Sequence, residues 1–388
     1  MNVAEWMSAL AVAVAAAACG GGGGGDETAA PTQPGGGAAA PSMQTLNSGL
    51  DRPWGIAQLP DGRLLVTQKG GSVVRLSAAG KTEATIAGIP AVQDSGQGGL
   101  LGIAIDPDFT TAGNNWVYIA YAEAGTGAES GKAGTTVARG RLEGDALTSV
   151  QVIFRQSPKV DGAGHFGARM VFARDKTLFI TTGERMKQTP SQDLQQTLGK
   201  VIRVNRDGTI PSGNPSFAAG ARPGIWSYGH RNIQGAALHP QTGELWITEH
   251  GPQGGDEVNI ARAGQNYGWP VKSYGCPYGS PVGEACRIGG GTHAPTYVEP
   301  LTTWTPISIA PAGLIFYTGS MFPEWRGQLI SGSLAGTALW RIAVNGDTVT
   351  GKEKMFGDLG ERFRDVIQAR DGSLLAVTDG GKLMRVAR

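Results

Sequence analysis

Short apolar runs recur in pairs along the chain. Each pair opens on a turn, often of the Asp-Gly type, and runs through an apolar segment, a polar break and a second apolar segment. The first pair covers residues 60–67 and 72–76, and the last covers 371–379 and 382–386. Apolar runs of this length, bounded by turn residues, predict β-strands. The six pairs begin at Pro60, Asn115, Asp175, Gly243, Gly327 and Asp371.

Six copies at intervals of about 45–85 residues indicate a repeat architecture with long insertions. Each copy spans about one four-stranded sheet, and a lone sheet cannot bury both faces. Radial stacking of six sheets buries them and leaves only short, protected edges. The pattern therefore predicts an all-β six-bladed β-propeller of four-stranded antiparallel blades over residues 46–388, with long loop insertions at the channel mouth. A β-sandwich is the alternative, but it does not need six copies.

The first 45 residues have a different pattern. Residues 6–18 form an apolar run that is short for a membrane span and ends at Cys19, followed by a run of glycines. This resembles a bacterial lipoprotein signal over residues 1–19, although Glu5 stands where a positive charge is usual. An uncleaved leader is the alternative. Residues 20–45 predict a Gly/Ala/Pro-rich disordered tether. We expect a periplasmic or extracytoplasmic protein, with a possible lipid anchor at Cys19.

Composition supports this picture. The 388 residues include 62 glycines, as expected for many short strands joined by tight turns. A net charge of +1 gives no electrostatic reason to expect nucleic acid as a partner. Apart from Cys19, the cysteines are Cys276 and Cys286, in a loop rich in glycine and proline. In an oxidising compartment such a pair predicts one disulfide, whereas two free thiols would suit a cytosolic protein.

Residues 229–269 concentrate polar side chains among glycines, aromatics and prolines. Hydrogen-bond donors are close together at Arg231, Asn232 and Gln234. Adjacent carboxylates at 256–257 and the stiff pair at 251–252, with its available carbonyl groups, offer hard oxygen ligands that suit Ca²⁺ better than a transition metal. A decorated loop is the alternative for any one of these residues, but not for the whole cluster.

Three further segments carry candidate chemistry. His165 lies between glycines and is a candidate general base near neutral pH, although a lone histidine is more often structural. Arg362 and Arg364 are two apart, so in a strand both would face one side, which suits a polyanion; two solvated arginines are the alternative. Gln97, in a glycine-rich loop, suggests close approach to a planar or anionic ligand.

Several of these segments occur together in a known order. From about residue 47 to the C-terminus, the chain resembles the soluble glucose dehydrogenase and aldose sugar dehydrogenase family, which uses pyrroloquinoline quinone (PQQ) and calcium on a six-bladed propeller. The resemblance implies oxidation of an aldose at C1 to the lactone, with an external quinone or cytochrome as electron acceptor. The matching segments are residues 52–55, 96–102, 164–169, 229–235, 249–259, 266–270, 309–311 and 362–365.

The resemblance also implies individual roles. His165 would be the general base that assists hydride transfer to PQQ, and Arg231 would stabilise the developing oxyanion. The carbonyl groups of Gly251 and Pro252 would hold the cofactor-bound Ca²⁺, whereas Glu257 and Tyr267 would bind a second, structural Ca²⁺. The implied cofactor contacts are Gln97, Arg231, Asn232, Tyr278, Ser308, Arg362 and Arg364.

One position departs from the family pattern. Where relatives often have a lysine that contacts the cofactor, this chain has Ala335, and Arg341 and Lys352 are the cations that we consider as substitutes. Two other functions stay open. A non-catalytic propeller that binds a glycan or protein partner would explain the missing lysine. A Ca-dependent lactonase-type hydrolase would need side-chain calcium ligands inside the channel, whereas the carboxylates at 256–257 lie in a single insertion.

Overall fold

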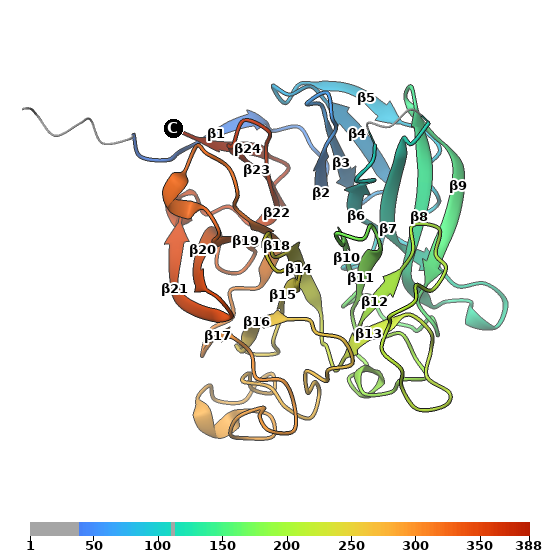
Figure 1. Cartoon of the computed structure of the whole chain (residues 1–388), viewed down its shortest axis with the longest axis vertical. Coiled ribbons are helices and arrows are strands. Elements are labelled where there is room, and N and C mark those ends of the chain that lie inside the picture. Colours follow the sequence, from blue (N-terminus) through green and yellow to red (C-terminus); the bar gives the residue numbers. More distant parts are fainter. Residues whose placement is uncertain (1–38, 110–112) are drawn as a thin grey trace, which may run out of the picture. The chain divides into compact units, whose positions relative to one another are not determined.

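The computed structural model describes residues 39–109 and 113–388, which contain 24 strands in six four-stranded antiparallel sheets (Figure 1). This part of the chain contains no α-helix, only single 3₁₀ turns. No helix within it is long and apolar enough to cross a membrane. The predicted signal and Cys19 lie outside the described residues. The expected six-bladed β-propeller is confirmed.

The blades follow one another along the chain. Blade 1 contains β2 (Pro53–Gln58), β3 (Leu64–Gln68), β4 (Ser72–Leu76) and β5 (Thr82–Ile86). Blade 2 contains β6 (Leu100–Ile105), β7 (Trp116–Ala124), β8 (Ala133–Glu143) and β9 (Ala146–Arg155). Blade 3 contains β10 (Gly167–Phe172), β11 (Leu178–Thr182), β12 (Lys200–Val204) and β13 (Ile225–Tyr228). Blade 4 contains β14 (Ile233–Leu238), β15 (Leu245–Glu249), β16 (Asp256–Ile260) and β17 (Thr302–Trp304).

Blade 5 contains β18 (Pro311–Phe316), β19 (Leu329–Ser333), β20 (Ala338–Asn345) and β21 (Thr348–Met355). Blade 6 contains β22 (Phe363–Gln368), β23 (Leu374–Thr378), β24 (Leu383–Ala387) and β1 (Ser42–Asn47). The 3₁₀ turns are η1 (Gly127–Glu129), η2 (Thr189–Ser191), η3 (Glu284–Cys286), η4 (Pro323–Trp325) and η5 (Gly357–Leu359). The six pairs of apolar runs in the sequence correspond to the second and third strands of the six blades.

The first strand of each blade lies on the inside of the ring. These strands contact one another in sequence, and β22 of blade 6 contacts β2 of blade 1 to close the circle. Glycines permit this close approach. A Cβ atom on Gly102 of β6 would lie 2.2 Å from the Ala168 carbonyl oxygen of β10, and one on Gly235 of β14 would lie 2.3 Å from that of Ala312. A larger residue at either position would push neighbouring blades apart.

The ring is fastened by the two ends of the described chain. Strand β1 pairs antiparallel with β24, with Met43 opposite Val386 and Thr45 opposite Met384 (Figure 1). The expected boundary at residue 46 is therefore wrong, because the fourth strand of blade 6 begins at Ser42. Its six residues are all exposed or half-buried and contain no apolar run that would distinguish them from a tether by sequence. Its order comes from pairing with the free edge of β24 and from contacts with blade 1, such as the hydrogen bond from Asn47 Nδ2 to the Gly80 carbonyl at 2.7 Å.

The core lies between neighbouring blades. Leu64 and Val66 of blade 1 pack with Leu375 and Val377 of blade 6, all of them buried. Similar apolar clusters fill other blade junctions, such as the one in which Tyr118 of blade 2 joins blade 3. Because each sheet is covered on both faces by its neighbours, the blades form a stiff ring. The loops at the mouth of its channel are positioned by that ring.

Candidate active site

Bulges in the inner strands build the first part of the site. The pairing register shifts between Pro53 and Gly55 in β2, between Ile233 and Gly235 in β14, and between Phe363 and Asp365 in β22. The extra residues at these bulges are Trp54, Gln234 and Arg364, and all three line one cavity of about 410 Å³, here called the channel cavity. A β-bulge re-aims a side chain at the rim of a sheet, and here repeated bulges collect side chains from several blades.

The channel cavity is rich in cations. Arg362 and Arg364 line it, as the sequence predicts, and both reach Asp379 of the same blade. Arg364 forms a two-pronged contact, at 2.8 and 3.1 Å, and Arg362 donates through Nε at 2.9 Å. The shared carboxylate offsets the repulsion between the two guanidinium groups. Burial alone would raise the pKa of Asp379, but the arginines hold it below its usual value.

His165 is held in a strained backbone conformation beside a carboxylate. Its φ angle is 51°, in the left-handed region, and its amide donates to Oε1 of Gln97 at 2.8 Å. Its Nδ1 contacts the carboxylate of Glu184, which follows β11 directly. Burial lowers the pKa of His165, the Glu184 carboxylate opposes this, and the charge of Arg231 acts with burial. The ring is therefore neutral near pH 7 and can accept a proton through Nε2.

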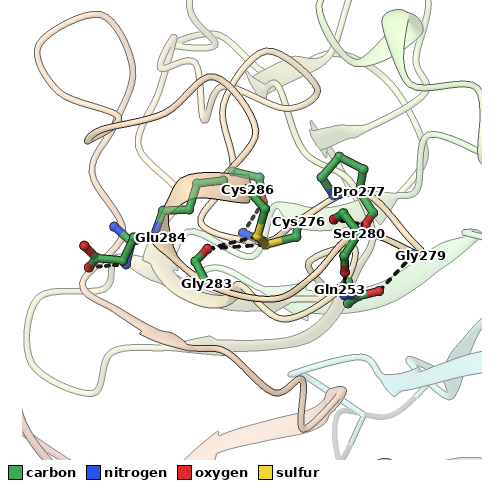
Figure 2. The surroundings of a disulfide bond; sticks show 11 residues. Gln253, Cys276, Pro277, Gly279, Ser280, Gly283, Glu284 and Cys286 are labelled. Atoms are coloured by element: carbon green, nitrogen blue, oxygen red, sulfur yellow. Dashed lines mark hydrogen bonds and ion pairs between the residues drawn. A yellow bond between two sulfur atoms is a disulfide. The ribbon is translucent and has the colours of Figure 1, made fainter.

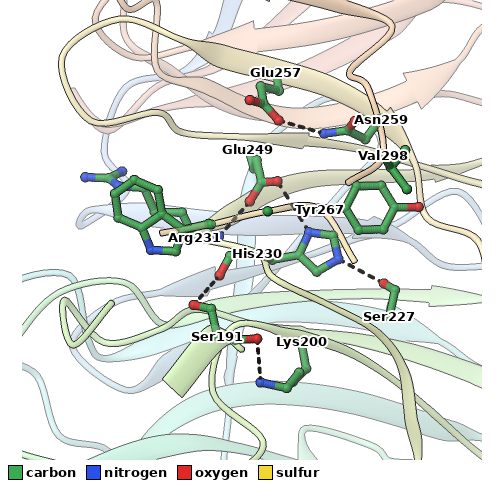
Figure 3. Close-up of polar contacts among 12 residues, drawn as sticks. Ser191, Lys200, Ser227, His230, Arg231, Glu249, Glu257, Asn259, Tyr267 and Val298 are labelled. Atoms are coloured by element: carbon green, nitrogen blue, oxygen red, sulfur yellow. Dashed lines mark hydrogen bonds and ion pairs between the residues drawn. The ribbon is translucent and has the colours of Figure 1, made fainter. Parts of the chain in front are cut away.

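Arg231 is fixed by the loop that enters β14 (Figure 3). Its amide donates to Oε2 of Glu249 at 2.8 Å, and Oε1 of the same carboxylate lies 3.3 Å from Nδ1 of His230. The His230 ring also meets Ser227 at 2.9 Å and stacks on Tyr267. This buried network sets the main chain at 230–231 rather than contacting a ligand. The next residue, Asn232, lines the channel cavity.

A second cavity of about 430 Å³, here called the outer cavity, lies beside His165, Glu184 and Arg231. Arg231 donates through Nη2 to the Tyr278 hydroxyl at 2.9 Å and through Nη1 to the His250 carbonyl at 3.1 Å. Its buried Nε has no partner among the described residues. The rest of the wall is largely apolar and comprises Met186, Gln188, Pro252, Trp269, Pro270, Pro277, Tyr278 and Ile288.

One wall of the outer cavity is formed by a disulfide-bonded loop. The structure joins Cys276 to Cys286, with Cα atoms 5.1 Å apart, in the loop that supplies Pro277, Tyr278 and Ile288 (Figure 2). The Cys276 main chain also pairs with Gln253 through two hydrogen bonds of 3.0 and 3.1 Å. Tyr278 is still 68% exposed. The predicted disulfide is therefore present, and it shapes this cavity.

The loop at 251–256 is organised by Asp256. The Asp256 carboxylate accepts hydrogen bonds from the Gly251 amide at 2.9 Å, from the Ser308 hydroxyl at 2.6 Å, and from the amides of Ile309 and Ala310. Ser308 lines neither cavity and its hydroxyl donates to Asp256, so its predicted cofactor contact stays a prediction. The Gly251 and Pro252 carbonyl oxygens accept no hydrogen bond from the described residues. They are free to bind a cation.

Glu257 lies in a separate buried polar cluster with Asn259 (Figure 3). Its carboxylate accepts from Asn259 at 3.0 Å and lies 3.8 Å from Nε2 of His293. Burial and the nearby Glu249 raise its pKa well above the usual range. The Tyr267 hydroxyl is bound to main-chain groups, including the Arg262 amide at 2.8 Å, so only its carbonyl oxygen is open. Nowhere in the described ranges do three His, Cys, Asp or Glu side chains form a metal site.

Among the lining residues that were not predicted, three matter most for the chemistry of the site. Trp54 and Lys69 line the channel cavity, and Glu184 orients His165. The only sequence signal was position: Lys69 and Glu184 stand just beyond the end of a short apolar run, and Trp54 stands at the start of one. The two cations considered as substitutes at Ala335 were wrong. Arg341 pairs with Glu353 across β20 and β21, and Lys352 lies over Trp304, so neither lines the channel cavity.

Comparison with known proteins gives concordant matches. Residues 50–385 match the family model described as Glucose / Sorbosone dehydrogenase. The aldose sugar dehydrogenase YliI of Escherichia coli is 40% identical over 354 residues, which cover 89% of this chain and 92% of that protein. The apo crystal structure of the soluble aldose sugar dehydrogenase from Escherichia coli has a TM-score of 0.83 and 38% identity, covering 90% and 99%. The PQQ-bound aldose sugar dehydrogenase of Streptomyces coelicolor has a TM-score of 0.73 and 29% identity, covering 90% and 98%.

Proposed function

This chain belongs to the glucose/sorbosone dehydrogenase family and is an oxidoreductase, and from that premise we propose that it oxidises aldose sugars at C1 to the lactone with PQQ and calcium. One observation carries the proposal: consecutive residues line both cavities. His165 lines the outer cavity and the next residue, Phe166, lines the channel cavity. Likewise, Arg231 lines the outer cavity and Asn232 lines the channel cavity. A cofactor in the channel cavity and a sugar in the outer cavity would therefore meet beside His165.

The residues present fit PQQ, which carries three carboxylates on a planar quinone. Arg362 and Arg364 supply positive charge to the channel cavity. The unpartnered Nε of buried Arg231 and the Asn232 side chain supply donors for quinone oxygens. The outer cavity, with Trp269 and Tyr278 in its wall, suits the apolar face of a pyranose ring. When bound, PQQ supplies the acceptor for the hydride that leaves C1.

The protein side of the reaction is proton transfer and charge stabilisation. Neutral His165 takes the proton of the anomeric hydroxyl at Nε2, while the C1–H bond breaks and a C=O double bond forms. Glu184 at Nδ1 fixes the ring and balances the charge that the proton brings. Arg231 lies beside His165 and stabilises negative charge that develops on the acceptor. The sugar loses two electrons and two protons in all, and leaves as the lactone.

Calcium fits the open oxygens of the site. The free carbonyl groups of Gly251 and Pro252 would hold the ion that accompanies the cofactor, with Pro252 in the outer cavity wall. Glu257 is a buried carboxylate without a lysine or arginine partner in the described ranges, and with the Tyr267 carbonyl it would hold a second ion. Main-chain oxygens, water and the cofactor would complete the coordination shells, because no three His, Cys, Asp or Glu side chains converge in the described ranges.

The proposed setting is extracytoplasmic. The Cys276–Cys286 disulfide supports an oxidising compartment. An external electron acceptor, a quinone or a small cytochrome, would reoxidise the cofactor through the exposed mouth of the site. Lipid attachment at Cys19 remains a prediction of the sequence.

The test is reconstitution of the purified full chain, stripped of cofactor, with PQQ and Ca²⁺, followed by dye-linked oxidation of glucose and other aldoses. We expect turnover only when both are added, and His165→Asn should bind PQQ but lose turnover by about 10²-fold or more. Turnover that survives chelation of calcium would contradict the calcium assignment. If the chain shows no PQQ binding by calorimetry and no turnover, the result contradicts the dehydrogenase and favours a non-catalytic propeller. Calcium-dependent lactone hydrolysis without PQQ would favour a hydrolase.

A further inference from the structure

The channel cavity contains a third cation that has no role in the fold comparable to that of the two arginines. Lys69 follows β3 and lines the cavity together with Arg362 and Arg364. Its Nζ donates to the Gly96 carbonyl at 2.6 Å. The arginines share Asp379, whereas the lysine forms no ion pair with a carboxylate anywhere in the described ranges.

The carboxylates nearest to Lys69 are already engaged. Asp94 is bound by Arg52 through two contacts of 2.7 and 3.1 Å, and Asp379 is bound by both cavity arginines. Burial, reinforced by the charge of Arg364, lowers the pKa of Lys69. An ammonium group that is half-buried beside another cation, with only a neutral carbonyl as partner, is poorly compensated in the free protein. An anionic ligand would compensate it.

We propose that Lys69 is a cofactor-binding residue that holds a carboxylate of PQQ in the channel cavity, and so supplies the cation that Ala335 does not. The inference rests on the proposed function. Ala335 lines the same cavity, so a lysine there and a lysine at position 69 would place their charge in one space. With Lys69 the cavity holds three cations for the three carboxylates of the cofactor. Lys69 reaches it from blade 1, whereas Ala335 lies in the turn between β19 and β20 of blade 5.

The chain contains a matched control. Lys352 also donates through Nζ to a carbonyl, that of Thr303 at 2.6 Å, but it is exposed on β21, over Trp304 and outside the cavity. Lys69→Gln and Lys352→Gln therefore make the same chemical change in two places. Glutamine keeps an N–H donor for the carbonyl and removes the charge.

The experiment measures PQQ binding to the apo-protein of the full chain, by calorimetry in the presence of Ca²⁺, independently of turnover. Lys69→Gln should weaken binding about 10- to 100-fold, as expected for a charge-assisted contact, and Lys352→Gln should leave it unchanged. Adding Ala335→Lys to Lys69→Gln should restore most of the affinity. The loss should shrink as NaCl increases, because salt screens the charge. Thermal unfolding without PQQ should be the same for all variants.

Two results would overturn the inference while leaving the function intact. Lys69→Gln could bind PQQ as tightly as the parent chain. Alternatively, it could bind more weakly without rescue by either Ala335→Lys or Lys69→Arg, which would show that position 69 acts only through the Gly96 loop. Failure of the parent chain itself to bind PQQ would instead overturn the proposed function, and the inference with it.

Discussion

At the scale of single residues, burial decides the protonation of the groups that the site needs. His165 and Glu184 are both buried, and the contact between them allows the histidine to remain a base without becoming permanently charged. The neighbouring cations Arg231 and Arg185 add to the effect of burial. A neutral imidazole beside a carboxylate is prepared to take one proton and to hold it briefly.

Glu184→Gln tests this pair. Activity requires unprotonated His165, so it is present above the pKa of that residue and lost as the pH falls through it. Because the glutamate carboxylate raises that pKa against burial, its loss should move the acid limb of kcat/KM to lower pH. At the same time, kcat should fall about 10²-fold or more. The measurement is a pH–rate profile of the reconstituted enzyme, with Glu353→Gln on blade 5 as control. An unmoved acid limb would show that another group titrates.

Lys200 gives a second prediction, on stability. It is buried and donates through Nζ to the carbonyls of Pro190, Ser191 and Leu198 at 2.8, 3.0 and 2.7 Å. Burial lowers its pKa from 10.5 to about 7. Between these two values the unfolded chain binds more protons than the folded chain, so the free energy of unfolding should rise with pH over that window.

The measurement is urea unfolding at several pH values between 7 and 10. Lys200→Met should be less stable at every pH, because three carbonyl groups lose a donor, and it should lose this rise with pH. A variant with the same slope as the parent would assign the pH dependence to other groups.

Site residues that belong to a distinctive local motif could be predicted from the sequence. Site residues whose role depends on a partner distant in the sequence could not. His165 among glycines and the arginine pair at 362 and 364 stand out in the sequence. Glu184 and Lys69 do not, since each matters only because another blade or strand brings a partner within reach. Ser308 shows the reverse case: the sequence gives no partner for its hydroxyl, whereas in the fold that hydroxyl donates to Asp256.

At the scale of elements, the middle strands of each blade carry the clearest signal. They are covered on both faces and therefore read as continuous apolar runs, such as β3 and β15, in which every residue is buried. Inner strands are interrupted by bulges and glycines that serve the channel. Outer strands such as β21 are mostly exposed and polar. Sequence periodicity therefore identifies the middle strands and does not identify the inner and outer strands.

The disulfide-bonded loop at residues 276–288 gives a prediction at the scale of elements. Cys276→Ser with Cys286→Ser should raise the KM for sugar, because the loop carries Pro277, Tyr278 and Ile288 into the outer cavity. It should leave PQQ affinity unchanged, because residues 276–288 contribute nothing to the channel cavity. Stability should fall by at most about 3 kcal/mol, the value for a short closed loop.

Steady-state kinetics, calorimetric PQQ binding and thermal unfolding separate these effects. An unchanged KM in the double serine variant would remove this loop from the sugar site. A parallel loss of PQQ affinity would mean that the disulfide supports the whole mouth rather than one wall.

At the scale of the whole molecule, stability depends on closing the ring. Blade 6 takes three strands from the C-terminal part of the chain and β1 from the N-terminal part. Without β1, strand β24 would present an open edge of main-chain donors and acceptors. The junction of blades 6 and 1, where Leu383 packs with Leu64 and Val66, would lose its outer cover.

Two truncations test this closure. Removal of residues 1–38 leaves β1 complete and should not change the melting temperature. Removal of residues 1–47 deletes β1, and should lower the melting temperature by roughly 5–10 °C and increase aggregation. Equal melting temperatures for both truncated chains would show that the three remaining strands hold blade 6 unaided.

The pairing of β1 with β24 also sets the order of events during biosynthesis. A ribosome delivers residues 42–47 first and residues 383–387 last, so the first strand waits for its partner until nearly the entire polypeptide has emerged. Intermediate blades can form as they appear, but the circle stays open until the end. The pairing that closes the ring is therefore also the last to form, after every other strand has been synthesised.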